Sequence, residues 1–173
     1  LINPSMLVEL EGLDPTERQG QVRWYKKPEA QYTYVVAMDP SLGTGGDPAG
    51  IQIFELPTFK QIGEWQHNKT PIQQQVGILT EIIRYLNETV NQNNIYYSVE
   101  NNTVGEAALI SISEIGEDNI KGIFLSEPKR AGSGRRFRKG FNTTNSSKIS
   151  ACAKLKNLIE SKRMTIAVSY THL

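Results

Sequence analysis

Two acidic residues stand directly after the two most apolar strand-like segments of the sequence. Asp39 follows residues 34–38, and Glu100 follows residues 95–99. A carboxylate beside a buried strand is costly unless a partner compensates its charge. If the two strands are parallel neighbours, both acids reach the same edge of one sheet. There they could bind divalent cations such as Mg²⁺, which prefers oxygen ligands.

The chemistry expected of such a site is phosphodiester hydrolysis. Two metal ions held roughly 3.5–4 Å apart can activate water and stabilise the leaving oxygen of an in-line displacement. Taken alone, either acid could be an ordinary turn former or helix cap. Asp47 fits a plain turn in Gly46-Asp47-Pro48, yet its loop could fold back and add an outer carboxylate. The joint occurrence of Asp39 and Glu100 favours the metal site.

The loop after Asp39 permits a second interpretation. Ser41, Gly43, Thr44 and Gly45 are similar to the phosphate-binding loop of actin-like ATPases, which binds phosphates with backbone amides and hydroxyls. The Walker A pattern of P-loop ATPases is absent. Glycines in a hairpin turn explain the same residues without any ligand.

The stretch from Lys129 to Lys139 is strongly basic, although the formal net charge of the whole chain is only +1. It has no acidic residue and is interrupted by glycines. It could be an ordinary solvated loop. Alternatively, it could be a flexible flap that contacts DNA phosphates, with Phe137 packed against a base or against the protein. Lys148 opens a helix, where the dipole disfavours a cation, and is a further candidate for meeting phosphate or a carboxylate. The candidate DNA-binding residues are Lys129, Arg130, Arg135, Arg136, Arg138, Lys139 and Lys148.

Apolar periodicity predicts the elements that position these residues. Three strands with hairpin-like links predict an antiparallel meander, and the later strands, joined by crossover helices, predict parallel pairing in a mixed α/β sheet. We expect Thr70 to cap the first long helix, with Pro71 at its first position. The expected elements are strands at 22–25, 34–38, 49–54, 60–66, 95–99, 122–125 and 164–168, and helices starting near 71, 103 and 148.

Length and composition restrict the class of protein. The 173 residues suggest one domain with flanking pieces. The single cysteine, Cys152, excludes a disulfide framework and a Cys-based zinc site, and we expect it to be buried in its helix. No apolar run approaches the roughly 20 residues of a membrane span, and no signal peptide is visible. We therefore expect a protein that is not secreted and has no membrane partner.

Several short segments together resemble the C-terminal nuclease domain of the large terminase subunit of tailed bacteriophages. This ribonuclease H-like domain belongs to the viral DNA-packaging motor. The resemblance runs from about residue 20 to 168 and is carried by residues 24–28, 34–43, 46–47, 99–102 and 140–159.

The resemblance implies an endonuclease that cuts concatemeric double-stranded DNA with two Mg²⁺ or Mn²⁺ ions. It implies Asp39 and Glu100 as catalytic metal ligands and Asp47 as a further ligand. It also implies, for the full-length protein, the small terminase subunit and portal as partners and the host cell cytoplasm as location.

The resemblance also divides the chain and shows one departure. Residues 1–30 are expected to be a lead-in after an ATPase domain, residues 31–168 the nuclease domain, and residues 169–173 a non-native tail. The family has a third carboxylate beyond the strand at 164–168, but no acidic residue follows Glu160 here. We therefore expect weak or absent cleavage by this polypeptide.

Two other functions stay open. Another ribonuclease H-like nuclease, such as a junction resolvase or a transposase core, would cut branched DNA or transposon ends. A noncatalytic DNA-binding module would show salt-sensitive binding without metal dependence.

Overall fold

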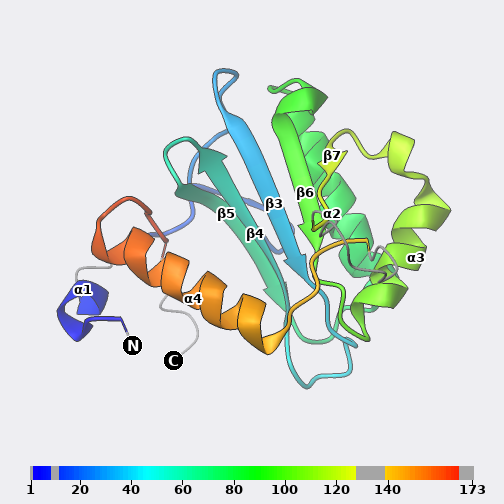
Figure 1. Cartoon of the computed structure of the whole chain (residues 1–173). Coiled ribbons are helices and arrows are strands. Elements are labelled where there is room, and N and C mark those ends of the chain that lie inside the picture. Colours follow the sequence, from blue (N-terminus) through cyan, green and yellow to red (C-terminus); the bar gives the residue numbers. More distant parts are fainter. Residues whose placement is uncertain (1, 9–11, 128–138, 168–173) are drawn as a thin grey trace, which may run out of the picture.

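A seven-stranded mixed sheet forms the centre of the molecule (Figure 1). The computed structural model describes residues 2–8, 12–127 and 139–167. The strand order is β1-β2-β5-β4-β3-β6-β7. The strands are β1 (Glu17–Gln19), β2 (Val22–Trp24), β3 (Thr33–Asp39), β4 (Ala49–Leu56), β5 (Lys60–His67), β6 (Ile95–Val99) and β7 (Ile123–Phe124).

The pairing confirms the predicted mixed sheet. Strands β3, β4 and β5 form the antiparallel meander, whereas β3–β6 and β6–β7 are parallel. The segment before residue 31 takes part in the same sheet, because β1 pairs with β2 and β2 pairs with β5. β1 was not predicted from the sequence, since its three residues are polar and give no apolar alternation.

Helices lie on both sides of the sheet. Figure 1 shows α4 on the side of the sheet opposite α2. The helices are α1 (Pro4–Val8), α2 (Ile72–Asn87), α3 (Gly105–Ile115) and α4 (Asn145–Glu160), with 3₁₀ turns η1 (Gln92–Asn94) and η2 (Glu117–Asn119). None of the helices in the described ranges is long and apolar enough to cross a membrane.

The main core lies between the sheet and α2. Alternate residues of β3 are fully buried there: Tyr34, Val36 and Met38. The apolar face of α2 recurs at helical spacing and is buried as predicted, through Val76, Leu79, Ile82, Ile83 and Leu86. Burial of these side chains removes apolar surface from water and holds the helix on the sheet.

The start of α2 differs from the prediction. Pro71 is the N-cap residue, and no side chain caps the helix. The Thr70 hydroxyl instead pairs with Nδ1 of His67 at 2.7 Å, because the turn after β5 brings the two side chains together. The carbonyl oxygen of Thr70 accepts a hydrogen bond from the side chain of Gln75.

The predictions for the C-terminal part need three corrections. Helix α4 begins at Asn145, slightly before the predicted start at 146–148, because Thr144 and Ser147 form a reciprocal capping box. Cys152 is exposed, since Ile159 is the residue that α4 buries. The described part of the expected strand at 164–168 forms a single parallel bridge, from Thr165 to Lys60.

The burial of α2 gives a first testable prediction. Leu79→Ala should lower the free energy of unfolding by about 2–5 kcal/mol, because Leu79 is fully buried and its loss leaves a cavity. Ile110→Ala on α3 is the control, since Ile110 is 60% exposed and its change should cost under about 0.5 kcal/mol. Urea unfolding measures both values. Equal effects would contradict the placement of α2 over the core.

Candidate metal site

The parallel pairing of β3 with β6 brings Asp39 and Glu100 together. The register pairs Met38 with Val99, so the next residue on each strand is one of the two acids. The amide of Glu100 donates to the carbonyl of Met38 at 2.9 Å, which extends the pairing by one step. Asp39 itself ends β3 opposite Gly50 of β4. The condition set by the sequence, two parallel neighbouring strands, is met.

The first turn of α3 packs against the backbone of Glu100. A Cβ at Gly105 would lie only 1.9 Å from the Glu100 carbonyl oxygen, so no larger residue fits without a shift. Asn102 connects the same elements. Its amide donates to Oε2 of Glu100 at 3.2 Å, and its oxygen accepts from the amides of Val104 and Gly105. Asn102 therefore orients the Glu100 carboxylate.

A return of the chain places the start of α4 beside Glu100. The Phe141 amide donates to Val99 at 2.9 Å, and the Asn101 amide donates to Phe141 at 2.7 Å. The side chain of Asn101 also donates to the Lys139 carbonyl at 2.8 Å. These bonds hold residues 139–141 along the end of β6 and bring Thr143 and Lys148 into reach of Glu100.

The two carboxyl groups have opposite pKa shifts. Desolvation, together with the hydrogen bond and negative charge of Glu100, raises the pKa of Asp39 from 3.8 to about 7. A hydrogen bond from Asp39 lowers the pKa of Glu100, and the Thr143 hydroxyl and the Lys148 charge act in the same direction. Below about pH 7, and above the lowered pKa of Glu100, the pair therefore holds one proton between the two carboxyl groups.

A divalent cation fits the chemistry of this pair. Both side chains offer hard oxygen ligands, and a cation between them would replace the shared proton. Asp47 lies exposed in the loop after β3. Within the described ranges, no group of three acidic, His or Cys side chains could hold a metal ion, so Asp47 does not complete a three-carboxylate site there.

The predicted DNA-binding residues are only partly visible. Lys129, Arg130, Arg135, Arg136 and Arg138 lie outside the described residues. Lys139 forms an ion pair with Glu117, and its ammonium lies 5.1 Å from the centre of the Phe124 ring. These contacts hold Lys139 against the protein, whereas the charge of Lys148 acts on Glu100 and lowers the pKa of its carboxyl group.

The loop after Asp39 does not favour the ATPase interpretation. The Ser41 amide is bound by the side chain of Gln75, and the Gly45 amide donates to the Asn68 carbonyl at 2.8 Å. A phosphate-binding loop needs such amides free to point at the ligand. The glycines instead allow a tight turn, since Gly43 and Gly45 have positive φ angles.

Asn102, Thr143 and Gln75 were not predicted as site residues. Asn102 lies in the segment 99–102 that carries the resemblance, but that resemblance assigned a role to Glu100 alone. Thr143 and Gln75 reach the site through contacts between distant parts of the chain. Their local sequence carries no signal of those contacts.

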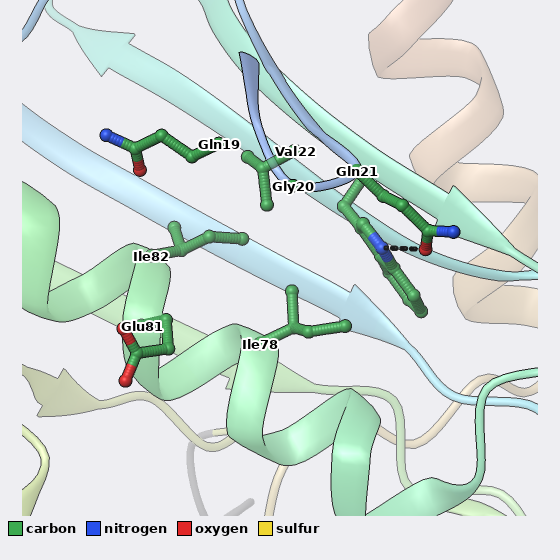
Figure 2. Close-up of a pocket in the computed structure, with 8 residues that line it drawn as sticks. Gln19, Gly20, Gln21, Val22, Ile78, Glu81 and Ile82 are labelled. Carbon is green, nitrogen blue, oxygen red and sulfur yellow. Dashed lines mark hydrogen bonds between the residues drawn. The ribbon is translucent and has the colours of Figure 1, made fainter.

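A cavity away from Asp39 and Glu100 has one acidic residue in its lining. It has a volume of about 380 Å³ and lies between the β1–β2 hairpin and α2 (Figure 2). Figure 2 shows Ile78 and Ile82 of α2 pointing toward the hairpin. The indole N–H of Trp65 donates to Oε1 of Gln21 at 3.3 Å. The one acid in its wall, Glu81, pairs with Arg84. None of its lining residues belongs to the carboxylate site.

The fold of this chain is similar to the folds of solved viral terminase nuclease structures. The large terminase nuclease from thermophilic phage G20c superposes with a TM-score of 0.66 at 16% identity, over 95% of this chain and 74% of that one. The human cytomegalovirus terminase nuclease domain matches with a TM-score of 0.55 at 14% identity, over 99% and 81%. This chain has the ribonuclease H-like fold of terminase nuclease domains.

That likeness confirms the predicted fold class, and it is a likeness of structure. No protein-family profile and no curated protein sequence matches the chain. Among the matching structures, the phage G20c nuclease has been solved with magnesium, cobalt and zinc, and the cytomegalovirus domain has been soaked with manganese.

The shared proton predicts a distinctive pH dependence of stability. Between pH 3.8 and about 7, the folded chain keeps a proton on Asp39 that the unfolded chain releases. Stability contributed by this site should therefore fall as the pH rises through that window. The lowered pKa of Glu100 has the opposite sign and acts at lower pH, around and below its ordinary value.

Asp39→Asn removes this titration while keeping a hydrogen-bond donor for Glu100. The variant should gain stability relative to the parent chain as the pH rises from 3.8 to about 7, as measured by urea unfolding. Asp47→Asn, in the exposed loop, is the control and should follow the parent profile. A constant difference between Asp39→Asn and the parent would contradict the shared proton.

Proposed function

We propose that this chain is a metal-dependent DNA endonuclease domain of a viral DNA-packaging terminase. The observation that carries the proposal is the parallel register that sets Asp39 beside Glu100 at the end of β3 and β6. The fold likeness to terminase nucleases supports it, as do the metal-bound forms of those structures.

In this proposal Asp39 and Glu100 hold Mg²⁺ or Mn²⁺ through carboxylate oxygens. The metal would supply an activated water and charge stabilisation for hydrolysis of a phosphodiester. Asn102 and Thr143 hold the Glu100 carboxylate in one orientation by donating to it. Asp39 gives up its proton when the cation binds, so metal affinity should rise with pH up to about neutrality.

A full two-ion site needs more oxygen ligands than this pair supplies. Asp47 is the proposed additional ligand, and it would have to approach the pair from its exposed position. Lys148 is proposed to contact a DNA phosphate near the acids, where its charge already acts on Glu100. The basic residues between 129 and 138 are proposed to follow the DNA backbone, and Lys139 would join them by exchanging Glu117 for a phosphate.

The proposed substrate is concatemeric double-stranded DNA in an infected cell. The proposed partners of the whole protein are the small terminase subunit and the portal, with the host cell cytoplasm as the place of action. These assignments rest on the fold and on the sequence resemblance.

A second candidate is a noncatalytic DNA-binding module. The observation in its favour is that the described residues gather two carboxylates and not three. Such a module would bind DNA with strong salt dependence and without any need for metal.

Plasmid cleavage separates the two functions. With Mn²⁺, the chain should nick supercoiled DNA slowly, and Asp39→Asn or Glu100→Gln should lower the rate at least roughly 10²-fold, because each change removes a metal ligand. Glu106→Gln, an exposed acid in the first turn of α3, is the matched control and should cut at the parent rate. Cleavage that survives both ligand changes would contradict the proposal. DNA binding without any Mn²⁺-dependent cleavage would favour the noncatalytic module.

A further inference from the structure

Gln75 is a polar side chain buried in an apolar helix face. It is 0% exposed and lies on α2 beside Val76 and Leu79, which are core residues. A buried amide is unfavourable unless its hydrogen bonds are made. Its position therefore calls for partners, and the structure supplies three.

All three partners belong to backbone around the site. Nε2 of Gln75 donates to the carbonyls of Ser41 at 2.8 Å and Thr70 at 2.7 Å. Oε1 accepts from the amide of Ser41 at 3.2 Å. Both backbone groups of Ser41, two residues after Asp39, are thus held by one side chain. Both donor hydrogens of the amide are used.

Two further contacts fix the same loop to the same turn. A Cβ on Gly43 would lie 2.2 Å from the Thr70 carbonyl oxygen, so the loop backbone presses directly on that turn. Gly45 and Asn68 exchange two hydrogen bonds, amide to carbonyl at 2.8 Å and side-chain amide to carbonyl at 3.1 Å. The loop from Ser41 to Gly45 is therefore fastened at three points to residues 68–75.

We propose that Gln75 is a positioning residue of the metal site. By fixing Ser41, it sets the direction in which the chain leaves β3, and with it the orientation of the Asp39 carboxylate and the path of the loop that carries Asp47. This role rests on the proposed function, since it needs Asp39 to be a metal ligand. Gln75 acts through the loop and does not touch the metal.

The test compares four variants for Mn²⁺ affinity by calorimetry and for amide hydrogen exchange. Gln75→Met keeps a similar side-chain length but loses the three hydrogen bonds from Gln75 to Ser41 and Thr70, which we call the clamp. It should raise the Kd for Mn²⁺ by about tenfold or more, as loss of an outer hydrogen-bond partner typically does. The amides of Ser41 and Gly45 should lose exchange protection in the same variant.

Two controls separate positioning from general destabilisation. Gln74→Met makes the same change at the exposed neighbour on α2 and should leave affinity and protection unchanged. Ile83→Val lowers the thermal midpoint through the core, away from the loop, and should leave the Mn²⁺ Kd unchanged. Gly43→Ala displaces the loop with Gln75 intact and should weaken Mn²⁺ binding too, which tests the proposal even if Gln75→Met does not fold.

The outcomes distinguish this inference from the proposed function. Parental Mn²⁺ affinity in Gln75→Met, or an equal loss in Ile83→Val, would overturn the positioning role. Unchanged protection of Ser41 and Gly45 in Gln75→Met would overturn the clamp itself. Failure of the parent chain to bind Mn²⁺ would overturn the metal site, while the metal-free exchange data would still decide the clamp.

Discussion

The candidate site depends on one backbone interaction, the parallel ladder between β3 and β6. Because side chains alternate along a strand, a one-residue slip would turn one of the two acids to the opposite face of the sheet. The observed register, with Met38 opposite Val99, leaves Asp39 and Glu100 as adjacent residues at the strand ends. Burial favours that register, since it pairs the buried Tyr34, Val36 and Met38 of β3 with the buried Ile95, Tyr97 and Val99 of β6 on one face of the sheet.

Around this pair, local polar contacts keep Glu100 in its ionised form. Asn102 and Thr143 donate to Glu100, and Lys148 adds positive charge. Desolvation and the neighbouring Glu100 raise the pKa of Asp39 to about 7. Gln75 acts one step further away, on the backbone that follows Asp39. The arrangement is costly for two bare carboxylates and favourable for carboxylates that share a proton or a metal ion.

The sequence predicts the parts of this structure that apolar patterns control. Hairpin-like links between apolar strands predicted the meander, and the crossover helices predicted the parallel pairing. The apolar runs of β3 and β6 drew attention to Asp39 and Glu100, which follow them. The sequence did not reveal the contacts of Gln75, because Ser41 lies 34 positions away and the amide looks like any other polar helix residue. The burial predicted for Cys152 was wrong, since α4 contributes little to the core. A Cys between two alanines indicates a helix but does not say which face is covered.

The most direct test of the central claim is a crystal structure of the chain soaked in Mn²⁺, with the ion located by anomalous scattering. The expected result is an ion bridging Asp39 and Glu100, with oxygen–metal distances near about 2.1–2.2 Å and the hydrogen bond between the two carboxyl groups replaced. Density for Mn²⁺ at other acids only, with Asp39 still hydrogen-bonded to Glu100, would contradict the assignment of this pair as the metal site.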